Sequence, residues 1–581
     1  MSIRHALRQS GWDIAWLVLL ACLTAAWCLS AGSALGVTFD EPFYLDKGLE
    51  AWRTGSYKAL MRAGTMPLPV DLQTLPLFLW EQWRGVPFQV YADMPDDLPV
   101  ARAMNLLFLW LLLVYGLLWG RLLGGPWAGR VTAGFLACDP NLLGHAALAT
   151  TDIALAAMVF VATYHFLRGR EQSWRWRVLL PGVLYGLALT AKASALPYVP
   201  LLAGIFGLWH LAQSGRFSSP HPERFRARLF RFWSVTRRLR WDLATLIGIG
   251  IVTLFAYCGC DWKPEPTFIT WADSLPEGPF HDGMRALSRN LAIFTNAGEG
   301  LAQQIKHNLR GHHGAYVLGE WYPRAVWYYF PAALMVKLPD ATLLLLLVLL
   351  LTRPRALATA AGWAVLALLL FSLNTRVQIG IRLAFPLIVY LHLMLAVAVV
   401  RPRRSETALE SEVSPGVRKK MALSWSLALA LIGIAVSATE AVLVWPDGIG
   451  YANRLWGGPE TSHRWLSDSN SDWGQGLPEL KAWWSRNQQP IVKVWYYGTD
   501  PSILLHPFFY FPVHALPERS PQVIRDEVGT GYLAVSDTLL RCNPDRRADN
   551  LALVDWLNQQ TPVDHVATFT IFRFPPEPSG P

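Results

Sequence analysis

The sequence predicts an all-α polytopic membrane protein with a small C-terminal α/β domain outside the membrane. Three observations support this fold class. Of the 581 residues, 52% are hydrophobic and only 16% are charged. The apolar residues form long runs up to residue 443, and the pattern then changes to strand-like alternation. Such a chain is too apolar to fold around one water-soluble core, so the runs are expected to lie in a membrane.

Eleven apolar runs are candidate membrane spans, because about 20 apolar residues cross the hydrocarbon layer. Two of them are short, so the expected total is about nine to thirteen. The first is longer than a signal-peptide core of about 7–15 residues, and we expect it to be an uncut anchor. The runs are Trp12–Leu35, Ala103–Leu123, Gly129–Leu142, Asp152–Leu167, Val178–Leu196, Tyr198–Leu211, Leu243–Cys260, Val326–Leu351, Leu357–Leu373, Leu383–Val400 and Met421–Leu443.

Basic residues in the short loops predict the orientation, because Lys and Arg stay on the cytoplasmic side. With the N-terminus inside, the inner segments carry 24 Lys and Arg residues. Segments 36–100 and 261–324 and the tail after residue 443 then lie outside a cell inner (plasma) membrane. These inner loops account for the net charge of +9. We therefore expect membrane lipids as partners and no nucleic acid.

The outer segments are expected to carry local structure. Leu45, Leu49 and Trp52 recur at helical spacing and predict an amphipathic surface helix after Asp40. The rest of the first outer segment is predicted to be a proline-punctuated chain packed on the membrane face.

The tail, residues 444–581, is predicted to be the α/β domain, and residues 1–443 the membrane module. Strand-like alternation occurs in "IVKVWYYG", "GYLAVSD" and "HVATFTIFRF". Helix-like intervals, "LPELKAWWSRN" and "ADNLALVDWLNQQ", separate these strands.

An acidic pair, Asp40 and Glu41, stands where the first span leaves the membrane. Asp40 could simply cap a helix, with Pro42 in the first turn. A carboxylate at this depth could instead serve as a general base. Asp152 is a second outward acid, at the end of the fourth span. It could be functional, or it could sit in the first turn of a helix that Thr150 or Thr151 caps.

Three basic residues are candidates for a phosphate site. Lys192 lies near the outer end of the fifth span and needs an anionic partner unless it snorkels to the interface. Arg376 and Arg382 stand in the one short outer loop that carries two basic residues. The planar guanidinium suits phosphate oxygens, and pairing with Asp or Glu of another loop is the alternative.

Two metal-like patterns do not support a metal site. His312, His313 and Glu320, with His307 nearby, fit no zinc spacing, so substrate hydrogen bonding or a surface role is preferred. In "DSNSDWGQGLPE" the acids have calcium-loop spacing, but Trp473 occupies the position that requires glycine. A loop leading into a helix is expected there.

Together, "FDEPFYLDKGLEAWRTGSY", "ATTDIAL", "LALTAKAS" and "GIRLAFPL" resemble the GT-C superfamily of integral-membrane glycosyltransferases. The similarity is strongest to the branch of protein O-mannosyltransferases and lipid A aminoarabinose transferases. It implies that Asp40, Glu41 and Asp152 are catalytic, and that Lys192, Arg376 and Arg382 bind the donor phosphate. The residues expected to contact substrate are Tyr44, Arg102, His312, His313 and Glu320.

The resemblance implies a sugar donor linked to a polyprenyl phosphate and an inverting displacement outside the cytoplasm. The acceptor would be a hydroxyl of a lipid, glycan or protein, with Asp40 as the base; for an anionic phosphate acceptor, Asp40 would only position it. No cofactor is required by this reading, and a divalent cation stays open as an alternative. Two other functions compete: a transporter or flippase that uses Lys192, Lys337 and Asp340, and a non-catalytic assembly protein.

Overall fold

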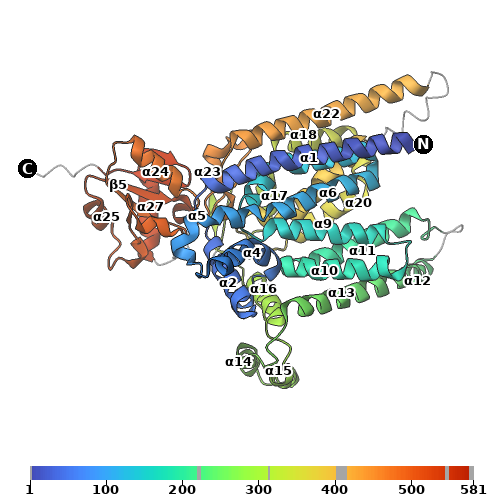
Figure 1. The fold of residues 1–581 in the computed structure, drawn as a ribbon, viewed down its shortest axis with the longest axis horizontal. Helices are drawn as coiled ribbons and strands as arrows, with labels where there is room; N and C mark the ends of the chain where they lie inside the picture. The colour runs from blue at the N-terminus through green and yellow to red at the C-terminus, as the bar shows by residue number, and fades with distance from the viewer. Residues whose placement is uncertain (1–2, 219–223, 312–313, 401–414, 543–547, 575–581) are drawn as a thin grey trace, which may run out of the picture.

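The computed structural model describes residues 3–218, 224–311, 314–400, 415–542 and 548–574. Long helices run side by side along the molecule, and an α/β unit covers one end of the bundle (Figure 1). The N-terminus lies at the opposite end. The C-terminal segment thus meets the helices at the end where α1 leads into the first long loop.

The bundle and its connections consist of fifteen α-helices and two short helical turns in the described residues. Their bounds are α1 (Ile3–Ala34), α6 (Leu106–Gly124), α7 (Pro126–Cys138), α8 (Pro140–Ala146), α9 (Asp152–Arg168), η1 (Arg175–Leu179), α10 (Leu180–Ala191), α11 (Ala195–Gln213), α12 (Phe225–Val235), α13 (Arg237–Cys258), α17 (Tyr329–Lys337), α18 (Asp340–Thr352), α19 (Pro354–Leu357), α20 (Ala360–Ser372), η2 (Ile381–Ala384), α21 (Phe385–Val400) and α22 (Pro415–Leu443).

Five helices in the described ranges are long and apolar enough to cross a membrane, and a sixth span results if α17 and α18, bent by 113°, count as one. The expected number of eleven is therefore not confirmed. Several predicted spans are shorter helices because a polar residue or a proline ends them. For example, α7 ends at Cys138 because Asp139 caps the next helix, accepting from the amides of Asn141 and Leu142.

The first outer segment is helical throughout most of its length. Its helices are α2 (Glu41–Thr54), α3 (Lys58–Arg62), α4 (Pro67–Arg84) and α5 (Val90–Ala103). Helix α2 confirms the amphipathic helix predicted after Asp40. The proline-punctuated chain predicted beyond it is wrong, because Pro67 and Pro69 lie in the first turn of α4, where their missing N–H groups cost nothing.

Two helices of the second outer segment, α14 and α15, project beside the bundle in Figure 1. The segment consists of α14 (Pro266–Asp273), α15 (Pro279–Asn290), α16 (Ala297–Arg310) and the antiparallel hairpin β1 (Ala315–Val317) and β2 (Glu320–Tyr322). The hairpin does not project, since Val317 of β1 pairs with Leu466.

The C-terminal segment contains a mixed five-stranded sheet with the order β4-β3-β5-β7-β6. All three predicted strand regions are present, but "HVATFTIFRF" forms a hairpin of two strands that turns at Ala567, whose φ is 50°. The elements are η4 (Arg454–Trp456), η5 (Pro459–Thr461), α23 (Ser462–Trp465), η6 (Asp468–Asn470), α24 (Leu477–Arg486), β3 (Val492–Trp495), η7 (Pro501–Leu504), β4 (Phe509–Tyr510), η8 (Val513–Ala515), α25 (Pro521–Val528), β5 (Tyr532–Ser536), α26 (Asp537–Arg541), α27 (Ala548–Gln559), β6 (Asp564–Val566) and β7 (Phe569–Phe572).

The hydrophobic core follows the same division. One large cluster fills the bundle, and two smaller clusters pack on the opposite faces of the sheet. Successive residues of one strand join different clusters: Leu533 and Val535 face one side, and Ala534 the other. This alternation is the period of two that predicted the strands.

Candidate active site

Asp40 lies at the turn between α1 and α2 and faces the C-terminal segment. It occupies the N-cap position of α2, yet its side chain makes no capping hydrogen bond. Its Oδ2 lies 3.4 Å from Nη1 of Arg382 and accepts a hydrogen bond of 3.3 Å from the Tyr44 hydroxyl. The capping alternative is therefore not what the carboxylate does.

Asp152 and Lys192 lie next to this contact. Together, Asp40, Arg382, Asp152 and Lys192 form a charged cluster. Asp152 Oδ2 lies 3.5 Å from Arg382 Nη1, and its Oδ1 lies 2.5 Å from Lys192 Nζ. Negative and positive groups alternate along the cluster. Its two ends are open to solvent, since the side chains of Asp40 and Lys192 are 30% and 17% exposed, against 7% for Arg382 and 1% for Asp152.

Arg382 is oriented by a loop of the C-terminal segment, residues 467–475. Its Nε donates to Ser469 Oγ at 2.9 Å, and its guanidinium carbon lies 4.0 Å from the ring centroid of Trp473. Within the described ranges, no protein group accepts from Nη2 of Arg382. The guanidinium is thus held on one side and free to bind an anion on the other.

The same loop is anchored to the bundle by buried polar contacts. Asn470 accepts from the amide of Ile381 at 2.9 Å and donates to the Tyr329 hydroxyl at 3.0 Å. Lys337 donates to the backbone carbonyls of Ile449 and Asn470 at 2.6 and 2.7 Å. Lys337, a candidate coupling residue of the transporter alternative, is therefore engaged in holding this loop.

Asp468 brings a third carboxylate to the site from this loop. Its backbone has a φ of 59°, a strained conformation for a residue other than glycine. Burial raises its pKa to about 6, against the lowering effect of the nearby Arg382 guanidinium. The "DSNSDWGQGLPE" pattern did not predict this position, because only the folded chain brings residue 468 to residues 40 and 382.

A small pocket with a mainly apolar lining lies between α11, α17, α20 and α21, next to Arg382 in the sequence. The next residue, Leu383, lines it, and the Tyr198 hydroxyl closes one side by donating to the Leu383 carbonyl at 3.1 Å. The other lining residues are mainly aliphatic or aromatic, among them Phe330, Leu368, Pro386 and Leu387.

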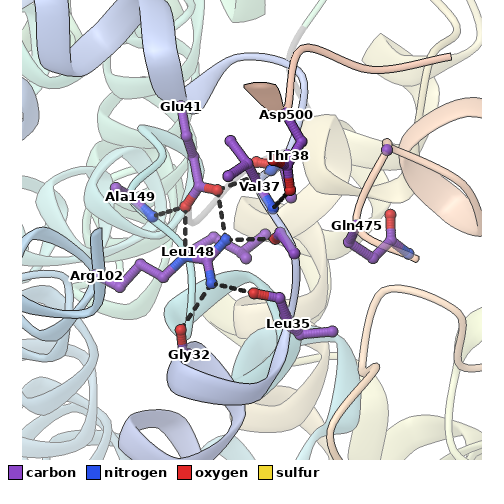
Figure 2. A network of polar contacts seen from close by, with 12 residues as sticks. Gly32, Leu35, Val37, Thr38, Glu41, Arg102, Leu148, Ala149, Gln475 and Asp500 are labelled. Atoms are coloured by element: carbon purple, nitrogen blue, oxygen red, sulfur yellow. Dashed lines mark hydrogen bonds and ion pairs between the residues drawn. The ribbon is translucent and has the colours of Figure 1, made fainter. Parts of the chain in front are cut away.

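Glu41 belongs to a separate, buried network with Arg102 (Figure 2). Arg102 Nε and Nη2 lie 2.8 and 2.6 Å from the two carboxylate oxygens. The same guanidinium donates to the carbonyls of Gly32, Leu35 and Gly36 at the C-terminal end of α1. Both side chains are buried, so this geometry favours a structural role over the catalytic role predicted for Glu41 and the substrate contact predicted for Arg102.

Two further hydrogen bonds complete the Glu41 network. The carboxylate accepts from the amides of Thr38 at 2.9 Å and Ala149 at 2.8 Å. Burial raises the pKa of Glu41, but the Arg102 charge and these hydrogen bonds outweigh it, so the pKa lies below its ordinary value. The network joins the end of α1, the start of α2 and the segment before α9, and so positions Asp40 and Asp152.

Comparison with known proteins gives one family match. Residues 100–227 match the family model described as dolichyl-phosphate-mannose-protein mannosyltransferase. The predicted resemblance to the GT-C glycosyltransferases is confirmed. No curated protein sequence matches the chain.

Two solved structures of similar proteins cover most of the chain. ArnT from Cupriavidus metallidurans, bound to undecaprenyl phosphate, is 14% identical with a TM-score of 0.46, over 96% of this chain and 97% of that one. The Archaeoglobus fulgidus oligosaccharyltransferase in its apo form is 13% identical with a TM-score of 0.42, over 91% of this chain and 70% of that one.

The remaining residues predicted from the GT-C resemblance do not all join the charged cluster. Tyr44 contacts Asp40 and belongs to it. Arg376 is exposed and donates to the Leu309 carbonyl at 2.9 Å. Glu320 is exposed on β2 and accepts from the Tyr322 hydroxyl. His312 and His313 lie outside the described residues.

Proposed function

We propose that the protein transfers a sugar from a polyprenyl-phosphate donor to an acceptor hydroxyl at the outer face of the membrane. One observation carries the proposal: two cations, Arg382 and Lys192, meet the carboxylates of Asp40 and Asp152, and the residue after Arg382 begins a mainly apolar surface. A lipid-linked sugar phosphate needs both features, a cationic group for the phosphate and an apolar site for the prenyl chain. The family match supports the proposal, because residues 100–227 include Asp152 and Lys192 and the family model describes transfer from a dolichyl phosphate.

The donor phosphate would bind to the donor hydrogens of Arg382 and Lys192 that point away from Asp152. Arg382 has Nη2 available, and Lys192 Nζ carries three donor hydrogens but contacts only Asp152 among the described residues. The prenyl chain would lie against the apolar side chains next to Leu383. Because Asp152 holds both cations, it would orient them for the phosphate rather than react with the sugar. Arg376 and Glu320 lie in other contacts and are left out of this site.

Asp40 is the general base of the proposed reaction. The acceptor hydroxyl attacks C1 of the sugar and gives its proton to the Asp40 carboxylate. The bond between C1 and the phosphate oxygen breaks, its electron pair stays on that oxygen, and polyprenyl phosphate leaves. Arg382 and Lys192 stabilise the charge that develops on the leaving group. A single displacement of this kind inverts the anomeric carbon.

Asp468 has a positioning role in this scheme. Its charge interacts with both Arg382 and Asp40, and the neighbouring Ser469 holds the Arg382 Nε. Ionised Asp468 would keep the guanidinium turned toward the donor and bind the acceptor hydroxyl near Asp40. If the acceptor were an anionic phosphate, no base would be needed and Asp40 would position it.

The test of the proposal replaces Asp40 by Asn in the full-length protein in membranes. A prenyl-phosphate sugar with a radiolabelled sugar serves as donor, and transfer to membrane acceptors is measured. We expect D40N to lose about 10²–10⁴-fold in rate, the range for a general base, while the protein inserts and folds normally. The control is Asp46→Asn, which removes a carboxylate from the same helix that pairs with Lys47. Transfer by D40N at the normal rate would remove Asp40 from the mechanism.

The amount of lipid-linked sugar donor in cell membranes distinguishes the proposed transferase from a flippase and from an assembly protein. Cells without the protein should accumulate a glycosyl-phosphoryl polyprenol that D46N, but not D40N, removes. If the protein were a flippase, cells without it would accumulate the same lipid on the cytoplasmic leaflet. Neither D40N nor D46N would then transfer sugar to an acceptor. An assembly protein would tolerate the loss of Asp40 and Asp152 together.

A further inference from the structure

Three potential metal ligands meet in the C-terminal segment, away from the charged cluster. His463 lies on α23, Asp537 begins α26, and His565 lies on β6. One ligand atom of each lies within 4.8 Å of the others. His463 and Asp537 are buried and His565 is partly exposed, so one side is open to solvent.

We propose that His463, Asp537 and His565 bind a divalent transition-metal ion, with Zn²⁺ as the preferred species. Two imidazoles and one carboxylate suit zinc and the neighbouring first-row ions, whereas calcium and magnesium prefer oxygen ligands only. Three protein ligands leave a fourth position, which a water molecule would fill. Binding of the ion does not depend on the glycosyl-transfer proposal.

The geometry of the three side chains fits an ion better than an isolated ion pair. His565 Nε2 lies 2.7 Å from Asp537 Oδ2. An ordinary pair of one histidine and one aspartate would account for this contact. The His463 ring, however, stacks on the His565 ring with a centroid distance of 4.0 Å. Within the described ranges, neither nitrogen of His463 has a hydrogen-bond partner in the protein. An ion between the three groups would use an imidazole nitrogen of His463 that has no hydrogen-bond partner among the described residues.

The carboxylate is already oriented for such a role. Thr570 donates its hydroxyl to Asp537 Oδ1 at 2.7 Å and leaves Oδ2 directed at His565. Bonds of about 2.0–2.1 Å to a tetrahedral zinc ion place its ligand atoms about 3.3 Å apart. Small side-chain rotations bring three atoms that lie within 4.8 Å to this spacing. A hydrogen bond from a hydroxyl to a ligating carboxylate is a common supporting contact of metal sites.

The ion would hold the loop that orients Arg382. His463 stands on the short helix that leads into residues 467–475, and Asp537 is followed by Thr538. The Thr538 hydroxyl accepts from the Asp468 amide at 3.2 Å and donates to the Asp472 carbonyl at 3.0 Å. An ion bound by His463 of α23 and Asp537 of α26 would therefore hold the loop 467–475 against Thr538. The position of this loop would then depend on the ion.

The test measures metal on the purified full-length protein in detergent. The protein is stripped with a chelator, dialysed against Zn²⁺ or Co²⁺, and analysed by mass spectrometry of the metal and by the visible absorption of Co²⁺. We expect about one ion per chain and a tetrahedral Co²⁺ spectrum. His463→Phe keeps the stacked ring and removes its nitrogens, and Asp537→Asn removes the charge. Both should retain less than one-tenth of the wild-type metal at micromolar free Zn²⁺.

Two controls make the result specific. His506→Ala removes an exposed imidazole of the same segment, which packs edge-on against Trp484, and should keep the full metal content. D40N should also keep it, which separates this site from the charged cluster. No ion on the wild-type protein at micromolar Zn²⁺, or an unchanged ion on folded H463F, would overturn the proposal. Should H463F fail to fold, the wild-type Co²⁺ spectrum and D537N decide the matter.

Discussion

Glu41 and Asp40 are adjacent acids, and a mutation of Glu41 tests which of them performs chemistry. Glu41→Gln keeps the side-chain size but removes the charge that balances buried Arg102. Four hydrogen bonds of 2.6–2.9 Å end on the Glu41 carboxylate, two of them from Arg102. Breaking one partner of a buried ion pair costs about 3–5 kcal/mol, because the other charge stays buried without compensation. We expect E41Q to lose a free energy of unfolding in this range.

The double variant Glu41→Leu with Arg102→Met provides the comparison. It removes both charges and should recover only part of the stability lost by a single change, because no charge stays unpaired but five backbone groups that the pair satisfied lose their partners. Denaturant unfolding in detergent micelles, followed by tryptophan fluorescence, measures the free energies. Transfer per folded molecule should fall far less in E41Q than in D40N.

The pH dependence of the same pair has a defined sign. Because the folded-state pKa of Glu41 is lowered, its contribution is complete above the unfolded pKa of about 4.3 and is lost as the pH falls toward the folded value. The wild type should lose stability below this pH more steeply than E41Q. If E41Q instead keeps its stability within about 1 kcal/mol and loses transfer, Glu41 is catalytic and the structural assignment is wrong.

The remaining predictions concern the donor and acceptor sides of the charged cluster. Lys192→Met should raise the KM for the lipid-linked donor or lower kcat by at least about 10-fold, because it removes a positive charge that stabilises the leaving phosphate. Arg376→Met should change both constants by no more than about twofold. Equal effects of the two changes in steady-state kinetics would contradict the placement of the phosphate. For Asp468, whose pKa is about 6, the transfer rate should fall as the pH drops through 6. Asp468→Asn should be slower and should lack this step; an unchanged acid limb in its pH profile would exclude Asp468.

The sequence identified the residues of the charged cluster, but it did not predict which of them would be in contact. Asp40, Asp152 and Lys192 were each identified as polar residues at the ends of apolar runs, where an ionisable group needs a partner. Arg382 was identified because it is a basic residue in an outer loop. Arg376, three residues after the predicted span that ends at Leu373, satisfied the same criterion but donates to a backbone carbonyl. Local spacing could not distinguish the two arginines, because their partners lie in other segments.

The C-terminal loop shows the same limit on a larger scale. The pattern in "DSNSDWGQGLPE" predicts a turn before a helix, and α24 does begin at Leu477. It contains no sign that Ser469 would hold Arg382, or that Asp468 would lie near Asp40, more than 400 positions earlier in the chain. The metal-like group His463, Asp537 and His565 is equally dispersed and has no spacing that a pattern could detect.

The order of residues along the chain was enough to locate the apolar segments, the alternation of helices and strands, and the helix ends at which charged groups must find partners. These properties depend on neighbouring residues and on the cost of leaving charge in an apolar environment, both of which can be read along the chain. Only the tertiary structure decided which partner each charge obtained. Adjacent positions in a helix point about 100° apart, so Glu41 reaches Arg102 while Asp40 reaches Arg382. The direction of a side chain and the segment that meets it are set by packing, and packing joins residues that no local pattern connects.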